Sequence, residues 1–109
     1  MAKKENVAEL SRKNFDEFVK KGVVMVDFFA DWCMPCVMMA PVIDELSEKF
    51  SGKVKFGKVN VEDNREISQK FNVSSIPNLV FFKDGKVVEQ IIGARSFDEL
   101  EKGLKNLVK

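Results

Sequence analysis

Hydrophobic positions along the chain alternate between two spacings. Apolar residues three and four apart indicate amphipathic helices, and short apolar runs bounded by turn residues indicate strands. The two patterns follow one another repeatedly, with no internal repeat, low-complexity segment or linker between them. This alternation is typical of an α/β fold. The length of 109 residues predicts a single domain over residues 1–109.

The chain is expected to open with a weak strand and a short helix. The strand lies near Val7 to Leu10, and Ser11 or Asn14 caps the helix, which ends near Gly22. The apolar stripe of this helix is Phe15, Phe18 and Val19. One amphipathic stripe of this kind is what a helix packed on a sheet requires.

A buried strand and a long helix are predicted next. Val23 to Ala30 is apolar in both phases, as expected of a strand covered on both faces. A helix follows the two cysteines and continues to about Phe50. The residues expected to face the core from this helix are Met39, Val42, Ile43, Leu46 and Phe50.

Two capping-box signatures predict the remaining helices. In this motif a short polar side chain and an acid three residues later cap the first turn reciprocally. Asp63 with Glu66 predicts a short helix after a strand at Lys53 to Val61, and Ser96 with Glu99 predicts the last helix. The buried residues expected from these helices are Ile67 and Phe71 in the first, and Phe97, Leu100, Leu104 and one or both of Leu107 and Val108 in the second.

A hairpin is predicted between these two helices. The apolar runs Leu79 to Phe82 and Val87 to Ile92 are separated by a segment that contains Asp84-Gly85, a strong hairpin signal. The expected order is therefore β-α-β-α-β-α-β-β-α. Early parallel strands and a late antiparallel hairpin give a central mixed sheet of four to five strands flanked by about four helices.

The charge balance and the apolar runs limit the classes of partner. With 18 basic and 17 acidic residues the net charge is +1, and no basic run predicts a nucleic-acid surface. The first residues, Met-Ala-Lys-Lys-Glu-Asn, precede no apolar segment of the kind a secretory signal has. The longest apolar stretch, residues 23–30, is far shorter than the ~20 residues that span a bilayer. A cytoplasmic monomer without a membrane partner is expected.

The only two cysteines lie in Trp32-Cys33-Met34-Pro35-Cys36, between the buried strand and the long helix. Residues three apart in a helical turn are neighbours, so a disulfide is accessible, and Pro35 favours the start of a helix. Unpaired N–H groups at a helix start lower the pKa of a nearby thiol. We therefore expect Cys33 to attack a substrate disulfide as a thiolate, and Cys36, deeper and less exposed, to resolve the mixed disulfide.

Three other interpretations of the cysteine pair compete with this one. A structural disulfide would stabilise the fold by only about 2 kcal/mol in so short a loop. Tetrahedral zinc needs four ligands, and a chain with two Cys and no His disfavours a metal site. The third interpretation, that both cysteines are inert buried thiols, is left open by the pattern. The position between a strand and a helix favours a redox role.

Two charged residues in apolar strands are candidates for proton transfer. Burial should raise the pKa of Asp27, which makes it a candidate proton acceptor and donor for Cys36; a satisfied structural Asp is the alternative. Lys58 shares a strand face with Val54 and Phe56 and is expected to pair with Asp27. A lysine that extends its ammonium into water is an equal alternative.

An apolar platform around the sulfurs is expected from Trp32, Met34, Ile76 and Gly93. Ordinary core packing and a strand-end glycine are the alternatives for these positions. A proline before a strand usually marks a plain boundary, and only about 5–6% of X–Pro bonds are cis. The pattern alone therefore does not predict a cis bond at Ile76-Pro77.

The segment Val26 to Cys36, read as VDFFADWCMPC, resembles the active-site segment of the thioredoxin family. The resemblance continues over nearly the whole chain in the same order. It includes Met38-Met39-Ala40-Pro41, Lys58-Val59-Asn60-Val61, Ile76-Pro77, Phe81-Phe82-Lys83-Asp84-Gly85 and Gly93. Such extensive agreement is specific to this family.

The resemblance implies the thioredoxin fold and the reduction of disulfides in client proteins. It implies electrons from a thioredoxin-reductase-type donor and no bound cofactor. The implied catalytic residues are Cys33 as nucleophile, Cys36 as resolving thiol, Asp27 as buried acid and Lys58 as its partner. The expected client-binding residues are Trp32, Met34, Pro35, Ile76, Pro77 and Gly93. Of these, Pro77 matches the family's cis-proline.

Four residues depart from the family pattern. The sequence has Phe29 for the usual Trp, Met34 for Gly, Val37 for Lys and Asn78 for Thr. Met34 lies between the cysteines, so it affects the redox potential and the choice of partner. A 30 mV shift in the reduction potential corresponds to only about 1.4 kcal/mol, which one side chain can supply. The alternatives are a glutaredoxin-like or isomerase-like dithiol protein, and a non-catalytic binding module of the same fold.

Overall fold

The computed structural model describes residues 6–109 and confirms the predicted order of elements. The elements are β1 (Val7–Glu9), α1 (Phe15–Val19), β2 (Val23–Phe29), α2 (Met34–Lys49), β3 (Val54–Asn60), α3 (Arg65–Lys70), β4 (Asn78–Lys83), β5 (Lys86–Ile92) and α4 (Phe97–Leu107). The expectation that no secretory signal is present rests mainly on residues 1–5, which lie outside the described residues. Within residues 6–109, no helix combines the length and the apolar character that crossing a membrane requires.

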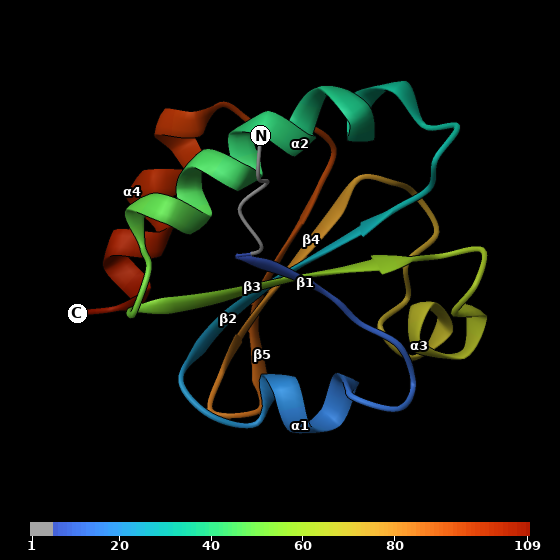
Figure 1. Ribbon diagram of the computed structural model, residues 1–109, viewed down its shortest axis with the longest axis horizontal. Coiled ribbons are helices and arrows are strands. Elements are labelled where there is room, and N and C mark those ends of the chain that lie inside the picture. Colours follow the sequence, from blue (N-terminus) through green and yellow to red (C-terminus); the bar gives the residue numbers. More distant parts are fainter. Residues whose placement is uncertain (1–5) are drawn as a thin grey trace.

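The five strands form one mixed sheet in the order β1-β3-β2-β4-β5. β1, β3 and β2 run parallel, whereas β4 is antiparallel to both β2 and β5. Helices α2 and α4 cover one face of the sheet and α1 and α3 the other (Figure 1). The parallel register of β2 and β3 places Asp27 beside Lys58. This layered arrangement is the mixed sheet that the sequence predicted.

The core consists of two apolar layers, one on each face of the sheet. β2 supplies both, because its side chains alternate between the faces and nearly all of them are buried. The layer under α2 and α4 includes Met25, Met39, Ile43, Leu46, Phe56, Leu79, Phe81, Leu100 and Leu104. The layer under α1 and α3 includes Phe15, Val24, Val26, Phe28, Val59, Ile67, Val80 and Phe82. The central strand is thus held rigidly at the point where it leads into the cysteines.

Two of the predicted turn and cap signals are confirmed. Asp84 and Gly85 both have positive φ, 50° and 87°, as a tight two-residue hairpin turn requires. At the start of α4 the Ser96 hydroxyl accepts a hydrogen bond from the Glu99 N–H at 3.2 Å, and the Glu99 carboxylate accepts one from the Ser96 N–H at 3.3 Å. This reciprocal pair is the predicted capping box.

Neither of the other two predicted helix starts has a side-chain cap among the described residues. Helix α3 follows Asn64 rather than Asp63, which corrects the prediction, and the Asn64 amide donates to the Asn60 carbonyl at 3.0 Å. Helix α1 follows Asn14, whose side-chain oxygen accepts from the Ser11 N–H at 2.7 Å rather than from the helix. In both places the side chain of the residue before the helix bonds to the preceding segment of the chain.

Gly57 of β3 lies where a β-carbon would displace the side chains of Leu10 and Phe18, and we expect Gly57→Ala to lower the free energy of unfolding by about 1–3 kcal/mol. A β-carbon there would lie 2.6 Å from Cδ1 of Leu10 and 3.1 Å from Cε2 of Phe18. Gly103→Ala is the matched control, because Gly103 lies within α4 and a β-carbon there would meet only open space. This change should stabilise the protein by about 0.5–1 kcal/mol. Urea unfolding measures both. A Gly57→Ala protein as stable as the parent would contradict this packing.

Candidate active site

Cys33 stands at the entrance of helix α2, immediately after the central strand. Its backbone is extended, with φ −85° and ψ 106°, and its sulfur occupies the position of a capping oxygen. The backbone N–H of Cys36 donates to Sγ of Cys33 at 3.2 Å. Pro35, whose missing N–H costs little in the first turn, follows in the helix. The sulfur of Cys33 therefore lies at the positive end of the helix dipole, where a negative charge is favoured.

The two cysteines form a disulfide, with their Cα atoms 5.3 Å apart. Both are buried, and each retains 5% of its surface. The prediction that Cys36 is less exposed than Cys33 is therefore wrong. The two cysteines form a buried cluster with Ala30, and Phe29, Val61 and Ile76 pack against this cluster. Residue exposure therefore does not distinguish the two cysteines, whereas their positions relative to the helix start do.

Asp27 is a carboxylic acid inside the apolar layer beneath α2. It is buried, and its Oδ1 has no hydrogen-bond partner within residues 6–109. Burial raises the pKa of Asp27 from 3.8 to about 7, although the positive charge of Lys58 acts in the opposite direction. The carboxyl group can therefore take up or release a proton near neutral pH.

Lys58 neighbours Asp27 across the sheet without forming an ion pair with it in the described part of the chain. The ammonium group lies 5.9 Å from the centre of the Phe29 ring instead. A cavity of about 210 Å³ is lined by Asp27, Lys58 and Cys36, together with Phe29, Ala30, Asp31, Val37 and Ala40. The structure thus brings the predicted acid, its cationic neighbour and the second cysteine to one hollow.

The predicted platform residues come from three segments of the chain. Trp32 and Met34 flank Cys33 and are largely exposed, as is Pro35. Ile76 packs against the two cysteines, and the Ile76–Pro77 peptide bond is cis. The Gly93 N–H donates to the Pro77 carbonyl at 2.8 Å, which places the end of β5 beside this loop.

Glu62 is a residue near the site that the sequence did not single out. The indole N–H of Trp32 donates to its Oε2 at 2.6 Å. The hydrogen bond joins residues thirty positions apart, and an exposed acid after a strand carries no local signal of such a contact. Glu62 fixes the orientation of the tryptophan beside the sulfurs.

Trp32 should report the redox state of the protein, because it is the only tryptophan and directly precedes Cys33. We expect its fluorescence to change in intensity when dithiothreitol reduces the disulfide, since the groups beside the indole change from a disulfide to two thiols. A Cys33→Ser/Cys36→Ser double variant is the control and should show no response to dithiothreitol. Identical spectra of the oxidised and reduced parent protein would contradict the close approach of indole and sulfur.

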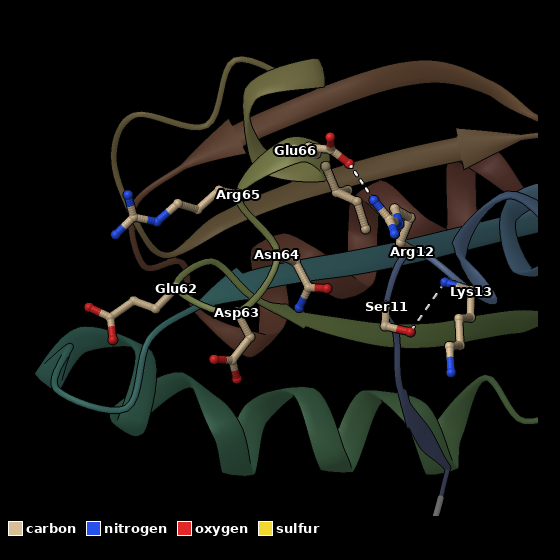
Figure 2. Close-up of a pocket in the computed structure, with 9 residues that line it drawn as sticks. Ser11, Arg12, Lys13, Glu62, Asp63, Asn64, Arg65 and Glu66 are labelled. Carbon is tan, nitrogen blue, oxygen red and sulfur yellow. Dashed lines mark hydrogen bonds and ion pairs between the residues drawn. The ribbon is translucent and has the colours of Figure 1, made fainter.

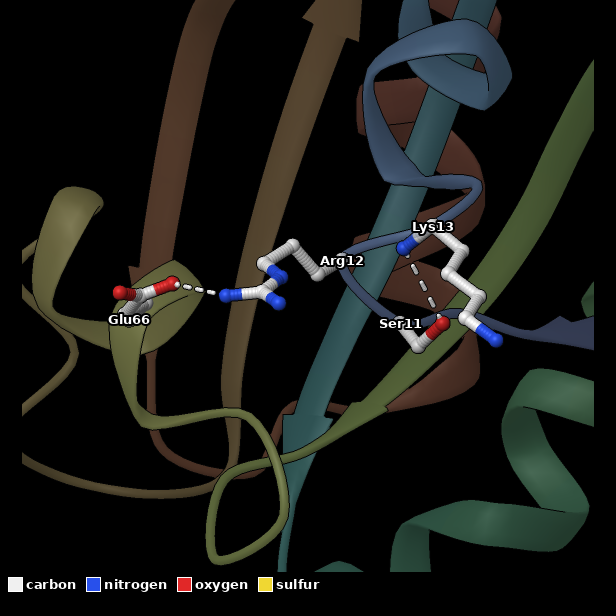
Figure 3. A network of polar contacts seen from close by, with 4 residues as sticks. All are labelled: Ser11, Arg12, Lys13 and Glu66. Atoms are coloured by element: carbon white, nitrogen blue, oxygen red, sulfur yellow. Dashed lines mark hydrogen bonds and ion pairs between the residues drawn. The ribbon is translucent and has the colours of Figure 1, made fainter.

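A second hollow, of about 500 Å³, lies between the segment before α1 and the segment around the start of α3 (Figure 2). The polar side chains that line it are Ser11, Arg12, Lys13, Glu62, Asp63, Asn64, Arg65 and Glu66. The Arg12 guanidinium pairs with the Glu66 carboxylate at 3.1 Å, and the Lys13 N–H donates to the Ser11 hydroxyl at 3.3 Å (Figure 3). Exposed pairs of this kind contribute about 0–1 kcal/mol. This hollow has balanced charges and no sulfur, so the chemistry lies at the cysteines.

Comparison with known proteins gives a consistent result. The thioredoxin family model matches residues 6–106. The chain is 44% identical to a thioredoxin of Chlamydia caviae over 94 residues, which are 86% of this chain and 91% of that protein. It is 41% identical to a thioredoxin of Listeria monocytogenes over 102 residues, 94% of this chain and 99% of that protein. Among solved structures, a single-residue mutant of a thioredoxin from Halobacterium salinarum superposes with a TM-score of 0.89 at 29% identity, covering 100% of this chain and 96% of that one.

Proposed function

The chain belongs to the thioredoxin family and is a thiol–disulfide oxidoreductase of the disulfide-reductase type, and from this we propose how its residues divide the reaction. The glutaredoxin-like, isomerase-like and non-catalytic alternatives are not favoured, because the relatives are thioredoxins and the cysteine pair is present. In the proposal Cys33 attacks the client and Cys36 releases it.

In the first step the Cys33 thiolate attacks one sulfur of a client disulfide. A bond forms between Sγ of Cys33 and that sulfur, the client's own S–S bond breaks, and its second sulfur leaves as a thiolate that takes a proton from water. The position of Sγ at the helix entrance, within 3.2 Å of the Cys36 nitrogen, supports this role because it stabilises the anion.

In the second step Cys36 resolves the mixed disulfide. The Asp27 carboxylate accepts the thiol proton of Cys36, and the resulting thiolate attacks Sγ of Cys33. The client sulfur leaves as a thiolate, and the Cys33–Cys36 disulfide forms, so two electrons have passed to the client. The shared cavity supports a proton path between Asp27 and Cys36, and the pKa of Asp27 near 7 suits both uptake and release. Lys58 keeps the ionised form of Asp27 accessible.

Membership in this family implies disulfide-containing clients and a reductase in general. We assign client contact to the platform around the sulfurs: Trp32, Met34, Pro35, Ile76, Pro77 and Gly93. A thioredoxin-reductase-type donor would return two electrons to the Cys33–Cys36 disulfide, which makes the protein an electron carrier. We also propose that the protein is a monomer and that it works in the cytoplasm. The cytoplasm keeps protein thiols reduced, as this activity requires.

The observation that carries this proposal is the cysteine pair with one sulfur at the helix entrance and the other beside a buried acid. The test is the reduction of insulin disulfides by dithiothreitol in the presence and absence of the protein. We expect the protein to accelerate the reaction at catalytic concentrations. A rate equal to that of dithiothreitol alone would refute the proposed function.

A further inference from the structure

Exposed apolar side chains are concentrated on the first two turns of α2. Among the described residues, the large hydrophobic side chains left exposed are Trp32, Met34, Val37, Met38, Val87, Val88 and Ile92. Four of these seven lie within residues 32–38. Met38 is 69% exposed and Val37 is 51% exposed. We name Met34, Val37 and Met38 the α2 ridge.

The α2 ridge is one continuous surface beside the disulfide. Its residues are three and four positions apart, so they lie on one face of the helix. The opposite face of α2, with Met39 and Ile43, packs on the sheet. No charged residue occurs from Trp32 to Ile43. A surface helix normally places polar residues on its outer face, as α4 does with Asp98, Glu99, Lys102 and Lys105. An exposed apolar patch of this kind marks an interaction site.

We propose that the α2 ridge binds an apolar segment that flanks the disulfide in a client protein, and that Val37 and Met38 thereby select clients. This rests on the proposed function. Met34 directly follows the buried Cys33 and is 65% exposed, so residues that flank a client sulfur at Sγ of Cys33 come close to Met34. The α2 ridge continues directly from that contact.

The geometry sets the size of the segment. From Met34 to Met38 the helix rises about 6 Å, because each residue adds about 1.5 Å. An extended chain covers that distance with about two residues. One or two apolar side chains next to the client cysteine therefore reach Val37 and Met38. The ridge itself offers no charge to pair with an acidic or basic segment, so burying a charged side chain there is unfavourable.

The test uses two disulfide-linked peptides that differ only in the two residues next to the cysteine, Leu-Val in one and Lys-Glu in the other. Hydroxyethyl disulfide, which is too small to reach Val37 and Met38, reports the dithiol chemistry alone. Stopped-flow Trp32 fluorescence gives the rate of oxidation of the reduced protein by each compound. The variants are Met38→Lys and the uncharged Met38→Gln. Val88→Lys is the matched control, because Val88 is a 45% exposed apolar residue on β5, near the hairpin turn and away from the cysteines.

We expect the parent protein and Val88→Lys to react about tenfold faster with the Leu-Val peptide than with the Lys-Glu peptide. Both Met38 variants should lose most of this preference and keep the parent rate with hydroxyethyl disulfide. An unchanged preference in the Met38 variants, or an equal loss in Val88→Lys, would overturn the inference. So would a dimer, seen by sedimentation, that Met38→Lys dissociates without changing the peptide rates, because the ridge would then bind a second copy. Failure of the parent to react even with hydroxyethyl disulfide would refute the proposed function, and the inference with it.

Discussion

Cys33→Ser is expected to remove all detectable catalysis, so that insulin is reduced no faster than by dithiothreitol alone. The attacking species in disulfide exchange is a thiolate, and a serine hydroxyl stays protonated at neutral pH. The fold should persist, because Cys33 occupies the N-cap of α2, a position at which Ser is favoured. The reduced parent protein is the reference for stability, since the disulfide itself contributes about 2 kcal/mol in so short a loop.

Cys36→Ser separates the two proposed roles. This variant keeps the attacking sulfur and lacks the resolving one, so it should accumulate a mixed disulfide with one client per chain. Mass spectrometry under non-reducing conditions measures the adduct, and peptide mapping locates it at Cys33. Cys33→Ser is the matched control and should accumulate no adduct. An adduct that forms more readily on Cys36 of Cys33→Ser than on Cys33 of Cys36→Ser would reverse the assignment.

Asp27→Asn is expected to stabilise the protein by about 4 kcal/mol above pH 7, since one pKa unit corresponds to about 1.4 kcal/mol. The pKa of Asp27 is about 7 in the folded protein against 3.8 for an unperturbed Asp. Between these values the folded protein binds a proton that the unfolded chain has lost. The favourable contribution of protonated Asp27 is therefore fully present below pH 3.8 and is lost as the pH rises to 7. Asn cannot ionise, so the variant escapes this loss.

Urea unfolding of the oxidised proteins at pH 4, 7 and 8.5 measures this difference. It should be small at pH 4 and close to its full size at pH 8.5. Asp31→Asn is the control, because Asp31 lies nearby but is exposed, and its effect should stay within about 0.5 kcal/mol. A stability gain of the same size at every pH would show that ionisation of Asp27 is not its source.

The same variant should slow the second chemical step and leave the first intact. Loss of a positioned proton acceptor typically costs about 10²- to 10⁴-fold in rate. Asp27→Asn should therefore form the mixed disulfide at the parent rate and release the client at least about 100-fold more slowly. Rapid-quench sampling distinguishes the two steps.

The fold could be predicted wherever the signal was local. Three features are formed by residues close in sequence: the apolar run of β2, which is buried on both faces, the Asp84-Gly85 turn and the Ser96–Glu99 capping box. The capping box predicted at Asp63 is absent, because α3 starts one residue later, after Asn64, whose amide donates to the Asn60 carbonyl at the end of β3. Such a bond back to the preceding strand is not visible in the spacing of residues.

The site was predictable to a smaller extent. The spacing of Cys33 and Cys36 and their place after a strand indicated the chemistry. The hollow shared by Asp27, Cys36 and Lys58 depends on strand register and on the path of α2, which only the folded chain defines. The cluster of Ala30 and the two cysteines is covered in part by Val61 and Ile76, which lie far along the chain. The hydrogen bond from Trp32 to Glu62 is of the same long-range kind.

The two cysteines are equally buried, so the helix entrance rather than exposure makes Cys33 the nucleophile. Treatment of the fully reduced protein with a limiting amount of iodoacetamide at neutral pH, followed by peptide mapping, distinguishes the two sulfurs. We predict that the label is found almost entirely on Cys33. Equal labelling of both cysteines, or labelling of Cys36 first, would contradict the account.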